Sequence, residues 1–278
     1  MLKTLNCNGK MLHLESPLVM GIINLNDDSF YAESRNNNLS IVLKKVEQMI
    51  NEGVDILDFG ALSSQPGSQL ISEDIERIRL EPILKEVIER FPEIIISVDT
   101  FRSKIAKLSL EMNVGIINDI YASRFDLDML DIVAKGKGTY IMMHMQGNPL
   151  NMQENPVYGG IITDLLEFFK QKIYQAIEIG IKDIVIDPGF GFGKTIRQNY
   201  ELLRNLDVFS ILGVPILAGI SRKSMISKRL NINSEESLNG TTAAHMIALM
   251  NNAKILRVHD VKQAKECITI FNETYLSS

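Results

Sequence analysis

Short, nearly continuous apolar runs recur eight times along the chain, and longer amphipathic stretches separate them. Such runs are typical of parallel strands, because helices cover both faces of a parallel sheet and bury its side chains. Eight strands that alternate with helices over roughly 250 residues favour a (β/α)8 barrel, an α/β fold also called a TIM barrel. The runs are VMGIIN, VDILDFG, IIISVDT, GIINDI, YIMMHM, DIVIDPG, PILAGIS and ILRVHD.

The stretches between these runs carry the periodicity of amphipathic helices. In SIVLKKVEQMINEG the apolar residues fall on one helical face, with Ser40 as the expected N-cap and Gly53 as the expected C-terminal stop. DLLEFFKQKIYQAIEIG and TTAAHMIALMNNA show the same pattern. A doubly wound open sheet is the alternative architecture, but the number of strands and the length of the chain favour the barrel.

No low-complexity segment or Pro/Ser-rich linker divides the chain, so we predict a single domain over residues 1–278. Residues 1–17 are expected to form a short leader ahead of the first barrel strand. Within it, the Asn8-Gly9 pair predicts the turn of a small β-hairpin.

The composition is that of an ordinary globular protein, with 45% hydrophobic and 23% charged residues. A net charge of -5 and the absence of a basic stripe argue against a nucleic-acid or anionic-membrane partner. No apolar run approaches the roughly 18 residues of a membrane helix, and the N-terminus lacks the apolar core of a signal peptide. Cys7 and Cys267 are expected to be free thiols in a reducing compartment. We therefore expect a cytoplasmic protein.

Polar residues stand at the end of every apolar run, and in a barrel these ends converge on one mouth, where barrel enzymes place their chemistry. Asp99, Asn118 and Asp187 supply hydrogen-bond acceptors and one amide donor. Such a set suits a flat heterocycle with several N–H groups, such as the edge of a pterin or a guanine. A helix cap for Asp99 and an ion pair for Asp187 are the structural alternatives.

Cationic donors follow at the last two strands, where barrels often bind phosphate. They are Lys223, Arg257 and His259. Arg257 and His259 alternate along one strand, so both side chains are expected to face the same side; a surface salt-bridge pair is the alternative. His13 and His245, in the leader and on a helix, are given no role.

The segment DPGFGFGKT, from Asp187 to Thr195, resembles a nucleotide-binding P-loop because it ends in Gly-Lys-Thr. A P-loop also needs a glycine five residues before Gly193, and Pro188 occupies that position. A glycine-rich loop that admits a ligand is therefore the better interpretation. Phe190 and Phe192 either stack on a flat ring or pack the loop.

Several segments, taken in their order along the chain, resemble the bacterial dihydropteroate synthase family over nearly the full length of the chain. The resemblance implies a (β/α)8 barrel that is usually homodimeric and cytoplasmic. It also implies an enzyme of folate biosynthesis, which joins p-aminobenzoate to 6-hydroxymethyl-7,8-dihydropterin diphosphate and releases diphosphate and 7,8-dihydropteroate. The segments are MGIINLNDDSF, DILDFGALSSQPG, ISVDTFRSK, GIINDI, MMHMQGNPLNMQ, DPGFGFGKT, GISRKSMI and RVHDVK.

The resemblance also implies the roles of individual residues. The pterin site would contain Asp99, Asn118, Met143, Asp187, Phe192, Gly219 and Lys223. The diphosphate would bind Asn24, Ser64, Arg257 and His259, with Asn24 also holding the cofactor Mg²⁺. The p-aminobenzoate site would involve Phe30, Gln65, Pro66, Ser221, Arg222 and Ser224. Lys223, Arg257 and His259 would act in catalysis, by electrostatic stabilisation and without a protein nucleophile.

Two long loops, after the first and second strands, depart from the family. Where the family commonly has NVTPDSFSDGG and GGESTRPG, this chain has NLNDDSFYAES and GALSSQPG. Asn26, Asp27 and Ala32 are changed, and Gln65 replaces a cationic residue. Because such loops commonly close over a substrate, we predict an altered p-aminobenzoate and sulfonamide pocket. A non-catalytic pterin-binding paralogue is the alternative function, and a pterin-barrel methyltransferase acting with a corrinoid protein is a third.

Overall fold

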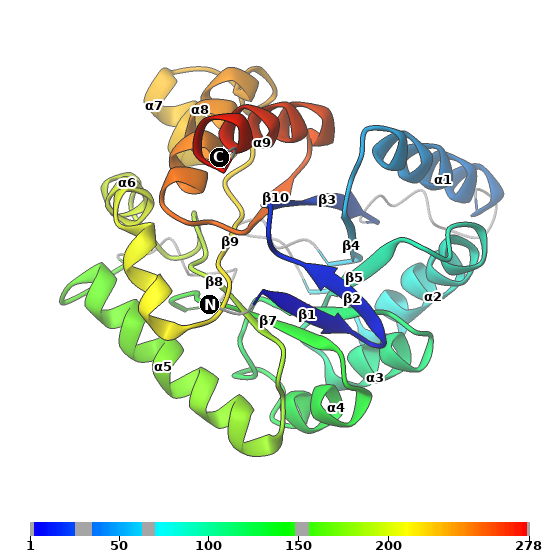
Figure 1. Cartoon of the computed structure of the whole chain (residues 1–278). Helices are drawn as coiled ribbons and strands as arrows, with labels where there is room; N and C mark the ends of the chain where they lie inside the picture. Colours follow the sequence, from blue (N-terminus) through cyan, green and yellow to red (C-terminus); the bar gives the residue numbers. More distant parts are fainter. Residues whose placement is uncertain (1–2, 26–34, 63–69, 148–155, 277–278) are drawn as a thin grey trace.

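The computed structural model of the chain describes residues 3–25, 35–62, 70–147 and 156–276. Eight parallel strands surround a central axis, and the helices lie outside them (Figure 1). All eight strands coincide with the apolar runs predicted from the sequence. They are β3 (Leu18–Asn24), β4 (Ile56–Gly60), β5 (Ile95–Asp99), β6 (Ile116–Asp119), β7 (Thr139–Met143), β8 (Ile184–Asp187), β9 (Leu217–Ala218) and β10 (Ile255–Val258).

Hydrogen bonding joins the strands in the order β8-β7-β6-β5-β4-β3-β10-β9. The two ends of this sheet meet through a parallel bridge between Ile186 and Ile216, where Ile186 N donates to Pro215 O over 3.0 Å. Neighbours around the ring are thus neighbours in the sequence, as in a barrel and unlike an open doubly wound sheet. The predicted barrel is confirmed.

Helices follow the strands and pack on the outside of the barrel. The helix α1 starts at Arg35, so the prediction that Ser40 caps it was wrong. Its first turn consists of polar residues that carry no apolar periodicity, and the pattern therefore placed the start too late. The helices are α1 (Arg35–Asn51), α2 (Glu73–Arg90), α3 (Ser103–Glu111), α4 (Met129–Gly136), α5 (Ile161–Ile179), α6 (Ile196–Arg204), α7 (Ser224–Leu230), α8 (Leu238–Met250) and α9 (Val261–Tyr275), with short 3-10 turns η2 (Leu206–Leu212) and η3 (Ser234–Glu236).

An N-terminal hairpin, β1 (Thr4–Cys7) and β2 (Lys10–His13), lies across the amino end of the barrel (Figure 1). Asn8 and Gly9 at its turn have φ angles of 52° and 92°, as the predicted two-residue turn requires. Apolar residues of the hairpin form one buried cluster with a residue from each barrel strand: Met20, Ile56, Ile95, Ile116, Ile141, Val185, Leu217 and Ile255. The hairpin and this ring therefore close one end of the barrel.

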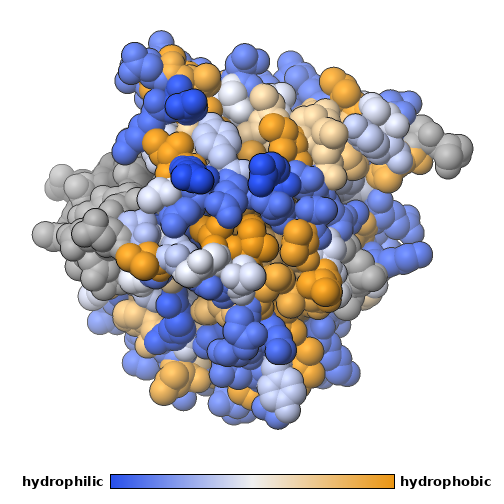
Figure 2. Space-filling view, turned by 90° about the vertical axis from the view of Figure 1, so that its left-hand side faces the viewer, coloured by the Kyte–Doolittle hydropathy of each residue, from blue (hydrophilic) through white to orange (hydrophobic). Residues whose placement is uncertain are grey.

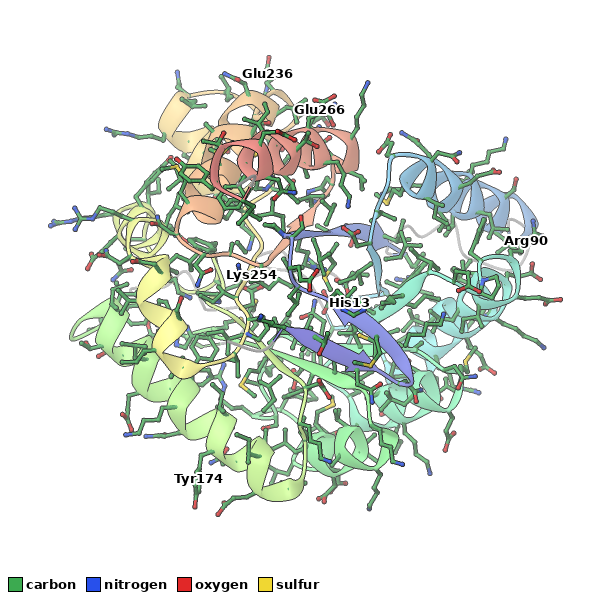
Figure 3. The ribbon with its side chains drawn as sticks, viewed as in Figure 1. His13, Arg90, Tyr174, Glu236, Lys254 and Glu266 are labelled. Atoms are coloured by element: carbon green, nitrogen blue, oxygen red, sulfur yellow. The ribbon has the colours of Figure 1, made fainter. Side chains whose placement is uncertain are left out.

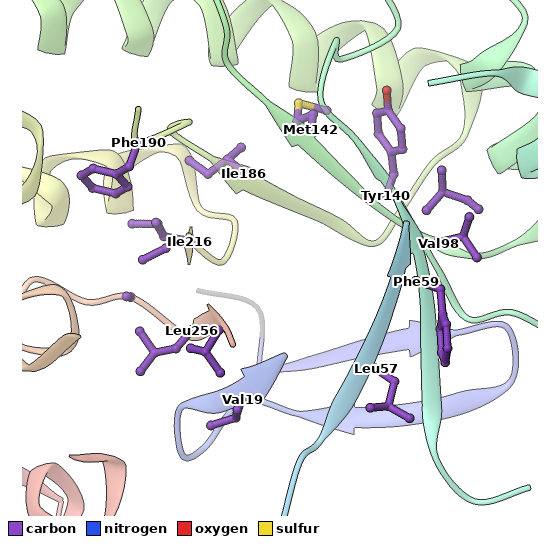
Figure 4. Close-up of a cluster of buried hydrophobic side chains, with 14 of the residues drawn as sticks. Val19, Leu57, Phe59, Val98, Tyr140, Met142, Ile186, Phe190, Ile216 and Leu256 are labelled. Atoms are coloured by element: carbon purple, nitrogen blue, oxygen red, sulfur yellow. The ribbon is translucent and has the colours of Figure 1, made fainter. Parts of the chain in front are cut away.

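Alternate residues of each strand face the helices and form a second core (Figure 4). In β4, Leu57 and Phe59 belong to this outer core, whereas Ile56 belongs to the inner ring. Because side chains alternate along a strand, Asp58 must face inward, above Ile56. The same alternation explains why each strand is apolar almost throughout and yet ends in polar groups on its inner side.

Charged side chains such as Arg90, Glu236 and Glu266 project from the outside of the helices, and His13 lies exposed on the hairpin (Figure 3). Figure 2 faces the side where α5 and α6 lie and shows hydrophilic and hydrophobic residues intermixed there. No helix within the described part of the chain is long and apolar enough to cross a membrane. Cys7 and Cys267 are both buried free thiols, as predicted.

Candidate active site

The carboxyl ends of the strands bring the predicted pterin-binding residues into one region. Asp99 pairs in register with Gly60 of β4 and with Asn118 of β6, and Met143 pairs with Asp187. Asn118, Asp187 and Met143 are 3%, 5% and 3% exposed. Three acceptor groups therefore lie together in a largely buried region at the carboxyl ends of the strands, where an unpaired polar group is costly and a matching ligand edge is favoured.

Arg257 connects these acceptors across the barrel. From β10, its Nε donates to Asp58 Oδ2 over 2.7 Å and its Nη2 donates to Asp99 Oδ2 over 2.8 Å. The two carboxylates raise the pKa of Arg257 above its ordinary value despite burial, so the guanidinium is permanently charged. Burial raises the pKa of Asp99 to about 7, with Arg257 opposing this shift and Asp58 adding to it. The cation predicted for the diphosphate is thus an integral part of the pterin region.

Asp58 belongs to the site, although no role was predicted for it from the sequence. It is fully buried, and its Oδ2 also accepts a 3.2 Å hydrogen bond from Asn118 Nδ2. Its other oxygen, Oδ1, is buried and has no hydrogen-bond partner in the described residues. The sequence did contain a signal for this role, because a carboxylate at an inward position of an otherwise apolar strand needs a partner. In the structure, Arg257 is that partner.

Lys223 and Asp187 lie close to each other on the other side of this region. Burial lowers the pKa of Lys223 to about 8, a shift that Asp187 opposes and Arg257 reinforces. Its Nζ lies 4.5 Å from the ring centroid of Phe192 and donates to the carbonyl of Phe190. A Cβ atom on Gly219 would lie 3.6 Å from Asp187 Oδ2 and 3.9 Å from Lys223 Nζ. Gly219 therefore keeps open the space beside the two charged groups.

The two phenylalanines of the glycine-rich loop differ. Phe190 is fully buried in the outer core, so it packs the loop. Phe192 is half-buried and packs against the cluster that contains Met143. Phe192 and Met143 therefore remain candidates for the apolar walls of the predicted pterin site beside Lys223, whereas Phe190 does not.

The glycines of this loop are required by close backbone approach. Gly189 and Gly193 have φ angles of 72° and 60°, and a Cβ on them would lie 2.0 Å from His144 O and 2.7 Å from Gln146 O. Only glycine fits such positions without a rearrangement. The glycines therefore pack the loop onto the end of β7, so they do not form a phosphate cradle.

Lys194 and Thr195 have structural roles. The Nζ of Lys194 donates to the carbonyls of Gly189 and Phe192, both at 2.9 Å, and lies 3.1 Å from His144 Nδ1. Burial lowers the pKa of Lys194 well below its ordinary value. Thr195 caps α6 in a capping box with Gln198. The rejection of a P-loop agrees with these contacts, because the lysine faces the protein's own carbonyls.

Two other polar strand ends also serve the fold. Asp119 accepts hydrogen bonds from Tyr140 Oη at 2.7 Å, Tyr121 N at 2.8 Å and Ser123 N at 2.7 Å. His144 is 8% exposed, and burial followed by the charge of Lys194 lowers its pKa to about 2. Neither side chain is free to meet a substrate, so position at a strand end alone does not identify a site residue.

His259 lies just beyond β10 and contacts Ser221. The hydroxyl of Ser221 is 3.0 Å from His259 Nδ1 and accepts the His259 backbone N–H over 3.2 Å. Arg222 points elsewhere: it donates two hydrogen bonds to Asp260, of 2.8 and 2.7 Å. Ser224 is exposed and is the first residue of α7. The roles of these three residues toward p-aminobenzoate stay predictions.

Asn24 ends β3 and is exposed at the mouth. The remaining predicted ligands, Phe30, Ser64, Gln65 and Pro66, lie outside the described residues, as do the changed positions 26, 27 and 32. Within the described residues, no group of three His, Cys, Asp or Glu side chains could hold a metal ion.

Comparison with known proteins agrees with this geometry. A family model described as a pterin binding enzyme matches residues 20–259. The dihydropteroate synthase of Escherichia coli is 39% identical over 268 residues, which are 96% of this chain and 94% of that protein. The chain belongs to the dihydropteroate synthase family. The Haemophilus influenzae member is 37% identical and covers 97% of this chain and 98% of its own length.

Solved structures of dihydropteroate synthases share the whole fold. The Yersinia pestis enzyme, in a complex with a sulfonamide drug, has a TM-score of 0.92 at 36% identity and covers 99% of this chain and 100% of its own. The Xanthomonas albilineans enzyme with 4-aminobenzoic acid has a TM-score of 0.91 at 32% identity and covers 100% of both chains. The likeness extends over the whole barrel, including the strand ends that carry the site.

Proposed function

We propose that the protein is an active dihydropteroate synthase, a transferase that joins p-aminobenzoate to 6-hydroxymethyl-7,8-dihydropterin diphosphate. One observation carries the proposal: Asp99, Asn118 and Asp187 converge with Lys223 at the carboxyl ends of the strands of a barrel that belongs to this family. Carboxylate and amide oxygens suit the N–H groups of a pterin edge, and the lysine suits its carbonyl.

The diphosphate would lie above the pterin, at the mouth. Arg257 and His259 follow one another on that side, and Asn24 ends the neighbouring strand β3. Mg²⁺ usually keeps several waters and binds one or two protein oxygens together with substrate phosphates. The single amide oxygen of Asn24 fits such an ion, brought by the diphosphate. Bound there, Mg²⁺ would neutralise charge on the leaving group.

The reaction breaks the C–O bond between the pterin methylene and the diphosphate, whose oxygen keeps the electron pair. Arg257 and His259 stabilise that negative charge, and the carboxylates of Asp99 and Asp187 stabilise the positive charge left on the pterin. The amine of p-aminobenzoate then forms the C–N bond with its lone pair and loses a proton to solvent. The residues position and stabilise the reactants without forming a covalent bond to them.

The direct test is incubation of the protein with dihydropterin diphosphate, Mg²⁺ and p-aminobenzoate, followed by detection of dihydropteroate and diphosphate in equal amounts. Binding of the pterin without turnover would instead identify a non-catalytic paralogue. An Asp187→Asn variant is the matched control, because it removes one pterin-facing charge with little change in volume. We expect it to lose product formation while keeping the fold, as monitored by circular dichroism.

We further propose that the protein works in the cytoplasm as a homodimer, as the family resemblance implies. Exposed apolar side chains on adjacent outer helices support an association surface: Ile247 and Met250 on α8 and Ile270 on α9 are 44%, 57% and 61% exposed. Light scattering of the purified protein tests this, and a monomer mass at micromolar concentration would contradict it.

The changed loop residues Asp27 and Gln65 support an altered p-aminobenzoate pocket, since Gln65 lacks the charge that the family commonly has there. We expect weaker binding of sulfonamides than in the Escherichia coli enzyme. The comparison needs inhibition constants for both enzymes under one set of conditions. A Gln65→Arg variant should move this protein's value toward that of the relative.

A further inference from the structure

The contact between Ser221 and His259 has a consequence for the proposed diphosphate site. Ser221 follows β9 and is 5% exposed, and it meets His259, which follows the neighbouring strand β10. Its Oγ accepts the backbone N–H of His259 over 3.2 Å and lies 3.0 Å from Nδ1 of the same residue. One hydroxyl therefore contacts both the backbone and the ring of His259 and fixes where the ring stands.

The hydrogen-bonding capacity of the Ser221 hydroxyl favours one form of the neutral ring. A serine hydroxyl has one donor and two acceptor sites, and the backbone N–H of His259 occupies one acceptor. Among the residues that the structure describes, the hydroxyl proton has no acceptor other than Nδ1, so toward a neutral imidazole the pairing that satisfies both groups leaves the ring proton on Nε2. Toward an imidazolium, the hydroxyl rotates and accepts from Nδ1–H. In both forms Ser221 keeps its bond, and Nε2 remains an N–H donor.

The surroundings of His259 favour the neutral ring. The groups that face it are Arg257, Lys45 and Arg222, which are cationic, and Asp260, which is anionic. Loss of hydration and then the cations lower the pKa of His259 to about 4, although the residue keeps an exposed face. The position of the ring proton therefore decides whether His259 offers an anion a donor or a lone pair. Nε2 has no hydrogen-bond partner among the residues that the structure describes.

We infer that Ser221 is a positioning residue for the leaving diphosphate, which holds His259 as the Nε2–H tautomer so that this N–H donates to a diphosphate oxygen. The inference rests on the proposed function for its physiological anion, inorganic diphosphate being the probe. It assigns Ser221 a role through His259, whereas the family resemblance places this serine near p-aminobenzoate. Ser221 itself does not touch the reacting atoms.

The first test uses the unaltered protein, which contains only four histidines. Long-range ¹⁵N–¹H NMR correlations at pH 7.5 distinguish the two neutral tautomers, and a His259→Gln variant assigns the signal. We expect the Nε2–H pattern for His259, and an Nδ1–H pattern would overturn the inference. Because this measurement needs neither turnover nor a Ser221 variant, it remains decisive if the wild type makes no dihydropteroate, an outcome that would count against the proposed function alone.

The second test compares Ser221→Ala with Ser221→Thr, which keeps a hydroxyl. The loss of one hydrogen bond predicts about fivefold weaker binding of Mg²⁺-diphosphate by Ser221→Ala, and a similar rise in KM for the pterin diphosphate. Binding of 6-hydroxymethylpterin, which lacks the diphosphate, should not change. Ser221→Thr should recover most of the affinity. The matched control is Ser109→Ala in α3, which removes another buried hydroxyl, one that donates to Ile105 O.

The outcomes separate a positioning role from a merely structural one. Weaker diphosphate binding in Ser221→Ala alone, with mixed tautomers in its NMR spectrum, supports the inference. Equal losses in Ser221→Ala and Ser221→Thr would overturn it, because the hydroxyl would then be irrelevant. Unchanged tautomer populations in Ser221→Ala would overturn it as well.

Discussion

Arg257 donates from Nη2 to Asp99 Oδ2 over 2.8 Å, which ties the predicted diphosphate cation to a predicted pterin carboxylate. A second bond from Nε to Asp58 fixes the guanidinium on its other side. A pterin that takes the bond of Asp99 would leave one side of Arg257 available to the diphosphate. The two halves of the substrate are thus recognised by one hydrogen-bonded network, so binding of either half changes the partners of the other.

Removal of Arg257 should destabilise the fold as well as the site. Arg257→Met leaves the carboxylates of Asp58 and Asp99 close together without their cation, and we expect a loss of about 3 kcal/mol in the free energy of unfolding. Urea denaturation measures it. Adding Asp58→Asn should recover part of the loss, since one of the unpaired charges is then gone. Arg90→Met is the control, because Arg90 forms an exposed pair with Glu86 and should change stability by no more than about 0.5 kcal/mol.

If the double variant were no more stable than Arg257→Met, the ion pair would not be the cause of the loss. A rise in KM for the pterin diphosphate without any loss of stability would likewise contradict a structural role for the network.

The lowered pKa of Lys223 predicts that pterin binding depends on pH. Its pKa is about 8, and a bond to the pterin carbonyl favours the charged form, so affinity should be constant below about pH 7 and fall as the pH rises above 8. Stability should show the opposite slope: the unfolded chain, with a lysine pKa of 10.5, holds more protons between pH 8 and 10.5, so the free energy of unfolding rises there. Fluorescence titration and urea denaturation measure the two effects. Both should disappear in Lys223→Gln, and a pH profile identical to the wild type in that variant would rule Lys223 out as the source.

Gly189 should tolerate no side chain. A Cβ there would lie 2.0 Å from His144 O at a φ of 72°, whereas Gly213 has a φ of 75° and nothing within 4 Å of its Cβ position. We expect Gly213→Ala to cost about 1 kcal/mol from backbone strain alone, and Gly189→Ala about 3 kcal/mol because of the added clash. Thermal unfolding of the two variants separates the contributions. Equal losses would mean that the loop moves away from β7 without penalty.

Lys194 should contribute to the stability of the fold and not to the binding of phosphate groups. Lys194→Met leaves the carbonyls of Gly189 and Phe192 without their donor, which should reduce the free energy of unfolding by about 1–3 kcal/mol. Calorimetric titration should find the affinity for Mg²⁺-diphosphate unchanged. The exposed Lys170→Met serves as control for the loss of one positive charge. A tenfold drop in diphosphate affinity by Lys194→Met alone would restore the P-loop interpretation.

The sequence was sufficient to predict the barrel, because each strand is buried on both faces and therefore appears as a nearly continuous apolar run. Continuous apolar runs located all eight strands, even β9, which has only two residues in the ladder. The start of α1 was missed because its first residues are polar and carry no period. The residue pattern therefore predicts elements whose side chains must be buried. It carries no information at solvent-exposed positions, where many residue types are allowed.

The site was predictable as a set of strand ends but not as a network. Asp99, Asn118 and Asp187 could be found because strand ends converge in a barrel. That Arg257 crosses the barrel to Asp58 depends on side-chain reach between strands that are far apart in sequence, which no local pattern encodes. The partner of Ser221 was hidden for the same reason, since 38 residues separate it from His259.

Because the hairpin and the inner ring of apolar residues close the amino end of the barrel, the described residues leave its carboxyl end as the way into the predicted pterin site. A pterin bound against Asp187 would lie near this closed end, and a second substrate would then lie between the pterin and solvent. Under the proposed function, we therefore expect the pterin diphosphate to bind before p-aminobenzoate, and the diphosphate to leave before the joined product.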